Sequence, residues 1–255
     1  MGKIVKASSH RLRRADAEKD IELINMHAMK ELRPEEVFCF SVYLCDNDVD
    51  RDGERFTDRT LRQLAKLLVG KTGIMDHEWS AANQTCRIYR TEVAAPGGEN
   101  ILGEPLKALY GSAYMVRNDQ TAPFIDAIEA GILKEVSIGC RVESVKCSIC
   151  GKEMGWDGCG EHKKGVKYDG KLCCGELDGA ADAYEFSFVA VPAQRNAGVT
   201  KSMQDTGAAI ETLLNSELSD HADQLKALKE KIDMAMLSEE ERLRRAALHA
   251  YAENL

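Results

Sequence analysis

Cysteine spacing is the feature that most constrains this chain. Of its nine cysteines, five fall between positions 147 and 174. The four strongest candidate ligands form a CxxC pair and a CxxH pair: Cys147, Cys150, Cys159 and His162. Two ligands three residues apart can hold one ion from a tight turn, and Zn²⁺ takes four nitrogen or sulfur ligands in a tetrahedron. The spacing therefore predicts a closed, structural zinc site, with Cys173 or Cys174 as alternates for one ligand.

Composition narrows the class of protein. The chain of 255 residues is 44% hydrophobic and 30% charged, as in ordinary soluble proteins. A formal net charge of -8 argues against a nucleic-acid partner, although residues 3–14 form a local basic stretch. We find no signal peptide and no apolar run long enough to span a bilayer, so we expect a cytoplasmic protein without a membrane partner.

The order of the predicted elements indicates an α+β fold. Short alternating or β-branched segments predict strands, and two helices with a preceding N-terminal helical segment lie among them. The expected strands are 37–44, 73–76, 87–93, 106–115, 135–145 and 183–191, and the expected helices are 16–30, 58–69 and a short one from Pro123 to Gly131. This count favours a mostly antiparallel β-barrel with a few flanking helices.

Changes in composition divide the chain into three parts. Residues 1–34 form a charged N-terminal segment, residues 35–200 form the main domain, and residues 146–175 form a zinc-binding insertion within it. From about residue 206 to 255, Leu, Ala, Glu and Lys dominate, and six residues follow a 4-3-4-3-4 spacing: Leu214, Leu218, His221, Leu225, Leu228 and Ile232. This pattern predicts a helical tail, either a short coiled coil that self-associates or a helix packed on its own domain.

An acidic motif near residue 50 resembles a calcium-binding loop only in its first half. Asp48, Asp50, Asp52 and Gly53 occupy the positions of an EF-hand loop, but an arginine, Arg59, stands where a bidentate glutamate is required. A cation at that position would repel the ion, so we interpret the segment as an Asp/Gly turn.

Three polar side chains form a candidate catalytic group. Alternation along residues 134–145 places Ser137 and Gly139 on the polar face of a strand, where the glycine leaves space for another backbone. Alternation along 183–191 places Glu185 and Ser187 on one face. His77 directly follows a strand-like segment. Taken singly, each residue is a weak signal, because serines on strands and histidines beside acids are common.

Three segments together resemble the signature blocks of tailed-phage prohead (capsid maturation) proteases. They are residues 73–80 (GIMDHEWS), 135–139 (EVSIG) and 185–193 (EFSFVAVPA), in that family's order, and the DRDG turn at 50–53 is similar as well. The resemblance covers about residues 35–200. This family is similar in fold to the herpesvirus assemblins, whose barrel carries a Ser-His-His triad.

The resemblance implies a serine endopeptidase with His77 as the base and Ser137 as the nucleophile. Glu185 falls at the third position, where the assemblins have histidine, and a strand carboxylate in a salt bridge is its plainer interpretation. Candidate oxyanion donors are Arg141, Arg195 and backbone N–H groups. The implied substrates are the major capsid protein, the scaffold and the chain itself, inside a prohead in the host bacterial cytoplasm.

Other classes are open or disfavoured. A non-enzymatic, zinc-stapled capsid assembly or scaffold protein is the main alternative, because the helical tail suits both readings. A serine esterase of the α/β-hydrolase type is disfavoured, because no Gly-x-Ser-x-Gly elbow surrounds Ser137. A zinc hydrolase is disfavoured as well, because the chain has no HExxH and its predicted cluster is saturated with protein ligands.

Overall fold

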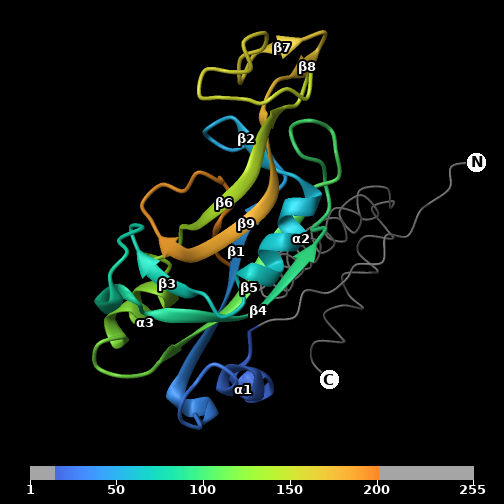
Figure 1. The fold of residues 1–255 in the computed structure, drawn as a ribbon. Helices are drawn as coiled ribbons and strands as arrows, with labels where there is room; N and C mark the ends of the chain where they lie inside the picture. The colour runs from blue at the N-terminus through green and yellow to red at the C-terminus, as the bar shows by residue number, and fades with distance from the viewer. Residues whose placement is uncertain (1–14, 201–255) are drawn as a thin grey trace, which may run out of the picture. The chain divides into compact units, whose positions relative to one another are not determined.

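The computed structural model describes residues 15–200, which form an α+β domain built mainly from strands (Figure 1). Three α-helices and two short 3₁₀-helices accompany the strands within this range. The strands are β1 (Val37–Asp46), β2 (Glu54–Phe56), β3 (Thr72–Met75), β4 (Cys86–Ala94), β5 (Ala108–Val116), β6 (Val136–Cys147), β7 (Lys167–Tyr168), β8 (Lys171–Leu172), β9 (Gly175–Phe188) and β10 (Gly198–Val199). The helices are α1 (Ala17–Asn25), η1 (Pro34–Glu36), α2 (Asp58–Leu67), η2 (Ala81–Asn83) and α3 (Ala122–Glu129).

The main sheet has eight strands and is mixed. Its order is β10-β1-β5-β4-β3-β9-β2, and β6 pairs with β9 beside this path. Most pairs are antiparallel, but β2 and β3 both run parallel to β9. The predicted barrel is not confirmed, because no continuous ladder closes the sheet. An isolated bridge between Glu135 and Gly198 joins the start of β6 to β10. Strand patterns in the sequence fix which face is buried, but they do not determine closure.

Strand β9 organises the part of the sheet that carries the polar residues. On one edge it pairs with β6 along almost its whole length, from Val136 opposite Phe188 to Cys147 opposite Gly175. On the other edge it pairs with β2 near its beginning and with β3 near its end. Figure 1 shows β6 and β9 running together from the loops around β7 and β8 towards β3. Distant parts of the sequence therefore meet along β9.

Helix α2 fills the edge of β9 between β2 and β3. Thr57 begins the helix by accepting a hydrogen bond from the Thr60 N–H at 3.2 Å. The Thr60 hydroxyl then donates to the Leu177 carbonyl, and Gln63 accepts from the Ala180 N–H. These side chains continue the hydrogen bonding along that edge of β9 beyond the β2 pairing, which ends with Phe56 opposite Leu177.

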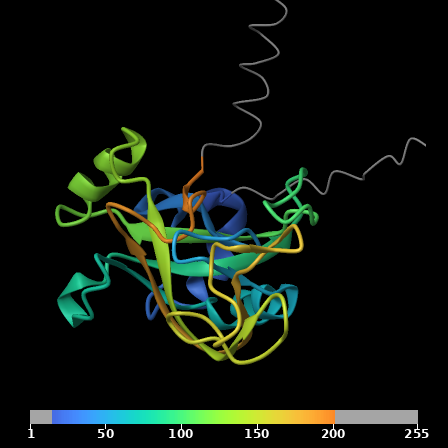
Figure 2. The same cartoon turned by 90° about the horizontal axis from the view of Figure 1, so that it is seen from above.

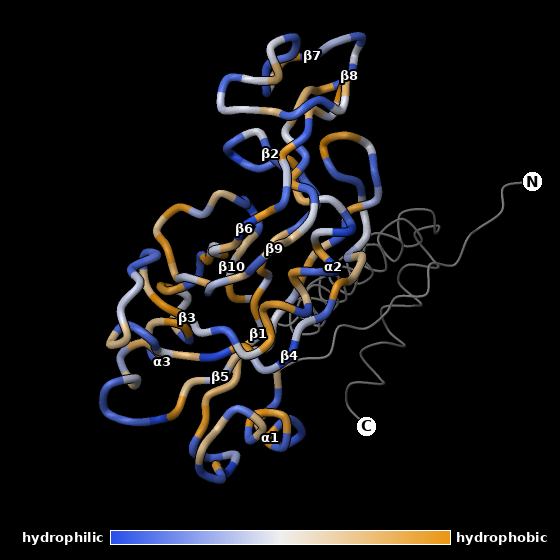
Figure 3. The backbone as a smooth tube through the Cα atoms, viewed as in Figure 1, coloured by the Kyte–Doolittle hydropathy of each residue, from blue (hydrophilic) through white to orange (hydrophobic). Residues whose placement is uncertain are grey.

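The hydrophobic core lies between α2 and the sheet. Leu61 and Leu64 of α2 and Leu68, which directly follows the helix, are fully buried. They pack with Phe186 and Phe188 of β9 and with side chains of β1, β4 and β5. Figure 2 shows the strands from above, and in Figure 3 the apolar parts of the tube follow them, whereas the loops around β7 and β8 are largely hydrophilic.

The segment that precedes β1 packs onto the same domain. Ile24 of α1 and Leu32 are buried against Tyr89 and Tyr114 in a second apolar cluster. Asp20 is fully buried, and its carboxylate accepts a hydrogen bond from the Tyr89 hydroxyl at 2.8 Å. None of the helices in residues 15–200 is long and apolar enough to cross a membrane. The predicted helical tail, 206–255, lies outside the described residues.

Candidate active site and candidate metal centre

A strained turn at the end of β3 presents His77. The strand ends at Met75, and the Asp76 N–H donates to the Phe188 carbonyl of β9 at 2.9 Å. Asp76 and His77 then both adopt left-handed backbone conformations, with φ of 51° and 55°. Such conformations cost on the order of 1 kcal/mol or more for a non-glycine residue and persist only where surrounding contacts enforce them. Here the His77 N–H donates to the Ser187 hydroxyl oxygen at 3.1 Å.

The Glu185 carboxylate is buried against this turn. Its side chain is 3% exposed, and Oε1 lies 2.9 Å from His77 Nδ1. Its second oxygen, Oε2, accepts a hydrogen bond from the Ser187 hydroxyl at 2.6 Å. Both oxygens of this buried carboxylate therefore have hydrogen-bonding partners. With Nδ1 donating to Glu185, Nε2 of His77 is the nitrogen that can take a proton from a nucleophile.

Gly139 of β6 makes room for this carboxylate. It lies opposite Glu185 in the β6–β9 ladder, and a Cβ built on it would stand 2.2 Å from Glu185 Oε1. The strand pattern predicted that this glycine leaves space for another backbone. That prediction is wrong, because the Glu185 side chain takes the space.

Ser137 lies on the strand beside these residues. It is directly opposite Ser187 in the antiparallel ladder, so their Cβ atoms are about 5 Å apart. Ser137 is half-buried, whereas Ser187 has no exposed surface. Within residues 15–200, no hydrogen bond joins Ser137 to His77. The structure therefore brings His77 and Glu185 into contact and places Ser137 next to Ser187. In free enzymes, catalytic hydrogen bonds are often long and tighten only with substrate.

The two arginines proposed as oxyanion donors differ in their surroundings. Arg195 donates through Nη1 to the Val49 carbonyl at 2.7 Å and so holds the turn after β1. Arg141 is exposed on β6, opposite Asp182. Neither side chain donates to the His77–Glu185 group in the described part of the chain.

Ser187 is a residue of the site for which the sequence predicted no role. The strand alternation placed it only on the same face as Glu185. The signal in the sequence is the Glu-x-Ser alternation, which puts the two side chains on one face of β9. What the sequence does not show is that the turn after β3 reaches both of them.

The predicted metal ligands converge at the other end of the β6–β9 pair. One ligand atom from each of Cys147, Cys150, Cys159 and His162 lies within 4.8 Å of all the others. The Ile149 N–H points to Cys147 Sγ at 3.4 Å, and the His162 N–H points to Cys159 Sγ at 3.3 Å. Such N–H donors stabilise the thiolate form, which is the form that binds metal. This cluster could bind a metal ion.

Sulfur contacts and charge fit that interpretation. Cys150 Sγ lies 3.6 Å from Cys159 Sγ, and Cys159 Sγ lies 3.5 Å from His162 Nδ1. Burial raises the pKa of Cys159, but the N–H groups of Glu161 and His162 and the other cluster contacts outweigh it and lower that pKa to about 6. These contacts favour the thiolate form of Cys159, which is the form that binds metal.

The two alternate ligands are in different positions. Cys173 is fully buried, and its Sγ lies 3.8 Å from Cys147 Sγ, at the border of the cluster. Cys174 belongs to different surroundings: its N–H donates to the Ser148 hydroxyl, and burial raises the pKa of its thiol. Cys173 therefore remains an alternate ligand by position, whereas Cys174 lies outside the group of converging atoms.

The acidic turn after β1 uses its carboxylates on its own backbone. Asp50 Oδ1 accepts from the N–H groups of Asp52 and Glu54, both at 2.9 Å. Asp48 Oδ1 accepts from the N–H of Val49 and from that of Ile101 in the β4–β5 loop. In residues 15–200, the ligand atoms that converge for a metal are those of the cysteine–histidine cluster. The segment is thus an Asp/Gly turn.

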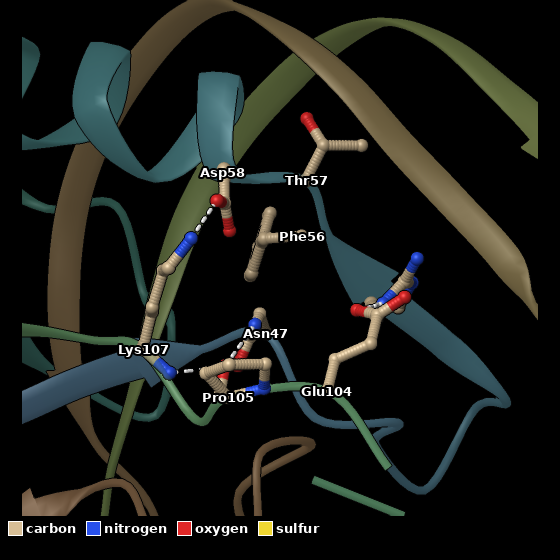
Figure 4. A pocket seen from close by; sticks show the side chains of 8 residues that line it. Asn47, Phe56, Thr57, Asp58, Glu104, Pro105 and Lys107 are labelled. Atoms are coloured by element: carbon tan, nitrogen blue, oxygen red, sulfur yellow. Dashed lines mark hydrogen bonds and ion pairs between the residues drawn. The ribbon is translucent and has the colours of Figure 1, made fainter. Parts of the chain in front are cut away.

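A small cavity of about 290 Å³ lies beside this turn (Figure 4). Its charged groups already have partners: Arg55 pairs with Glu104 and with Glu176, and Lys107 pairs with Asp58. The Asn47 side chain bonds the main chain at Pro105 and Lys107. The charged and amide side chains that line the cavity are therefore bonded to other parts of the domain.

No protein-family model matches the chain, and no curated protein or solved structure matches it either.

Proposed function

We propose that this chain is a serine endopeptidase of the prohead maturation type. The observation that carries the proposal is the buried Glu185 carboxylate bound to His77 Nδ1, with Ser137 on the neighbouring strand. Three such groups, a carboxylate, an imidazole and a serine hydroxyl, are the parts of a catalytic triad, which is recognised by geometry and roles instead of by chain order.

In this mechanism His77 Nε2 takes the proton of the Ser137 hydroxyl as the serine attacks the scissile carbonyl. Glu185 holds the imidazole in the tautomer with the proton on Nδ1 and stabilises the imidazolium that forms. His77 then gives the proton to the leaving amine, and a water molecule repeats the sequence on the acyl-enzyme. The side chain of His77 is 40% exposed, so it is accessible to substrate.

The metal has a structural role in this proposal. Zn²⁺ suits the donor set of three sulfurs and one imidazole nitrogen, and four protein ligands leave no open position for a reacting water. Cys147, Cys150, Cys159 and His162 would hold it, with Cys173 as the alternate closest to them. A bound ion would supply folding energy to loops that bury little apolar surface.

The substrate and location follow from the resemblance stated above. We infer that the substrates are the major capsid protein and the scaffold, within a prohead in a bacterial host, and that the chain also cleaves itself. The predicted tail would serve docking or self-association. We also infer that β6 and β10 complete an assemblin-like barrel, with the Glu135–Gly198 bridge as its seam.

The proposal is tested by co-expression of the chain with the major capsid protein of the same phage, as wild type and as Ser137→Ala. Intact mass spectrometry of the assembled particles then reports every shortened chain. We expect capsid protein or the chain itself to be shortened only with the wild type. Full-length chains in both samples would overturn the protease and leave the non-enzymatic assembly factor.

A further inference from the structure

We propose that Ser187 is a positioning residue that fixes both the Glu185 carboxylate and the His77 turn, an inference that rests on the proposed function. Within residues 15–200, its hydroxyl is the one group that hydrogen-bonds to both residues: it donates to Glu185 Oε2 and accepts from the His77 N–H. One side chain therefore sets the carboxylate on one side and the main chain of the base on the other.

The direction of each hydrogen bond is determined by the chemistry of the groups. A hydroxyl has one proton and two lone pairs, and an amide N–H can only donate. Since the His77 N–H occupies a lone pair, the hydroxyl proton is free for Glu185, and the 2.6 Å separation is that of a charge-assisted bond. No other orientation of the Ser187 hydroxyl makes both hydrogen bonds. Rotation of the hydroxyl would leave a buried carboxylate oxygen without a donor.

The same contacts explain why two left-handed residues persist after β3. Asp76 is held by the Phe188 carbonyl, and His77 by the Ser187 hydroxyl, so the turn is fastened to two successive residues of β9. Glu185, two residues earlier on the same face, receives the ring. Ser187 thus sets the distance between the backbone of His77 and the carboxylate that its ring must reach.

Ser187 is not itself a candidate nucleophile. It has no exposed surface, and its single proton is committed to Glu185. Ser137, opposite it on β6, is half-buried and makes no hydrogen bond to His77 within residues 15–200. Ser187 therefore acts on the reaction through Glu185 and His77.

The first test compares Ser187→Ala with a matched control, Ser112→Ala. Ser112 is another buried strand serine, 4% exposed, whose hydroxyl accepts from Arg90. For cleavage of a peptide that spans a mapped cut site, we expect kcat of Ser187→Ala to fall on the order of 10-fold to 100-fold, with KM nearly unchanged. Ser112→Ala should lose at most as much thermal stability and keep its kcat. Equal kcat values in the two variants would overturn the positioning role.

A double-mutant cycle then separates positioning from simple packing. If Ser187 acts through Glu185, the double variant Glu185→Gln with Ser187→Ala should turn over about as slowly as Glu185→Gln alone. Two rate losses that multiply fully would instead mean that Ser187 acts independently of Glu185, which contradicts the proposal.

A spectroscopic measurement keeps the inference separate from the protease hypothesis. A proton on His77 Nδ1 shared with a buried carboxylate should give a far-downfield proton resonance, assigned by its absence in Glu185→Gln. We expect this resonance to shift or disappear in Ser187→Ala and to remain in Ser112→Ala. If the wild type cleaves nothing but the resonance responds in this way, the positioning role stands and the proposed function fails. An unchanged resonance in Ser187→Ala overturns the positioning role whether or not the chain cleaves.

Discussion

The two ends of the β6–β9 pair differ in how they hold polar groups in place. At one end, the sheet itself buries Glu185 and Ser187, and Gly139 opposite Glu185 leaves room for its carboxylate. At the other end, the cysteines and His162 sit on loops whose buried apolar cluster has three members, Cys147, Met154 and Cys173. The first arrangement is complete without a ligand, whereas the second brings sulfurs together at metal-binding distance. One pair of strands therefore combines polar groups held by the core at one end with a cluster that could bind a metal ion at the other.

The turn after β1, together with the first residue of β2, contacts both ends. Glu54 pairs with Lys164 of the metal-binding loops, and Arg51 donates through Nη1 to the Pro192 carbonyl at 2.9 Å. Residue 192 belongs to the loop after β9, in which Arg195 binds the same turn at Val49. Substitutions at one end can therefore be tested for their effect on the other end, from the largest expected effect to the smallest.

The largest effect is expected for Cys159→Ser, which removes a ligand of the metal cluster. Structural zinc contributes about 10 kcal/mol or more of apparent binding free energy in small zinc domains, so one missing thiolate should abolish stoichiometric metal. Elemental analysis of purified protein measures the metal, and limited proteolysis should show new cuts within residues 147–174 while the sheet stays intact.

Cys174→Ser is the matched control for that change. Cys174 is a buried neighbour of the cluster but lies outside its converging atoms. We expect this variant to retain one equivalent of metal. Equal metal loss in both variants, or full metal content in Cys159→Ser, would contradict the ligand set.

The next effect is on catalysis at the other end. Glu185→Gln should lower kcat roughly 10⁴-fold, the scale known for replacing a triad carboxylate by its amide, because the amide no longer selects the His77 tautomer. Cleavage of the capsid substrate measures it. Metal content should not change. The control is Glu143→Gln. Glu143 is an exposed glutamate on β6 paired with Arg59, so this variant should keep full activity. A similar loss of kcat in the control would mean that Glu185 is not the triad carboxylate.

A moderate effect is expected for Gly139→Ala. The added methyl would stand 2.2 Å from Glu185 Oε1, so the carboxylate or the strand must move. Overpacking of this kind costs about 1–3 kcal/mol of unfolding free energy, and displacement of Glu185 should lower activity as well. Urea denaturation measures the loss.

Gly155→Ala is its control in the metal-binding loops. There the nearest atom to a new Cβ, the Gly158 carbonyl oxygen, is 3.7 Å away, an ordinary contact. The unfolding free energy should change by less than about 0.5 kcal/mol. A loss as large as that of Gly139→Ala would mean that the crowding at Glu185 does not decide the result.

The smallest effect concerns the shared turn. Burial raises the pKa of Asp50 from 3.8 to about 6. Between those two values the folded protein binds more protons than the unfolded chain, so stability should fall as pH rises through this window. Asp50→Asn keeps the acceptor oxygen for Asp52 and Glu54 but removes the charge. It should flatten this pH dependence and raise the unfolding free energy at pH 7 by about 1 kcal/mol, measured by urea denaturation at several pH values.

Sequence reasoning was most successful where the signal is local. The convergence of the four candidate metal ligands could be predicted because each pair is three residues apart. Helix α2 could be predicted because its leucines recur with the helical period. The His77–Glu185 contact joins residues 108 positions apart, and no spacing rule predicts it. The family resemblance placed both residues in one site.

The remaining differences come from strand register. Strand β9 begins at Gly175, eight residues before the predicted start, because its first half is rich in small and acidic residues that hide the alternation. Pairing with β6 makes that half a strand. The role of Gly139 depends on lying opposite Glu185, and barrel closure depends on which edges meet. Neither property can be predicted from the residue pattern of a single strand.

Because β3 pairs with a strand that is made much later, the contacts of His77 can form only late in synthesis. His77 leaves the ribosome long before Glu185 and Ser187, which lie 108 and 110 residues later. Until β9 is made, the turn after β3 has neither its carboxylate nor its hydroxyl, and the chain has no means to hold two left-handed residues. A nascent or truncated chain that ends before β9 therefore has a serine and a histidine but no assembled site.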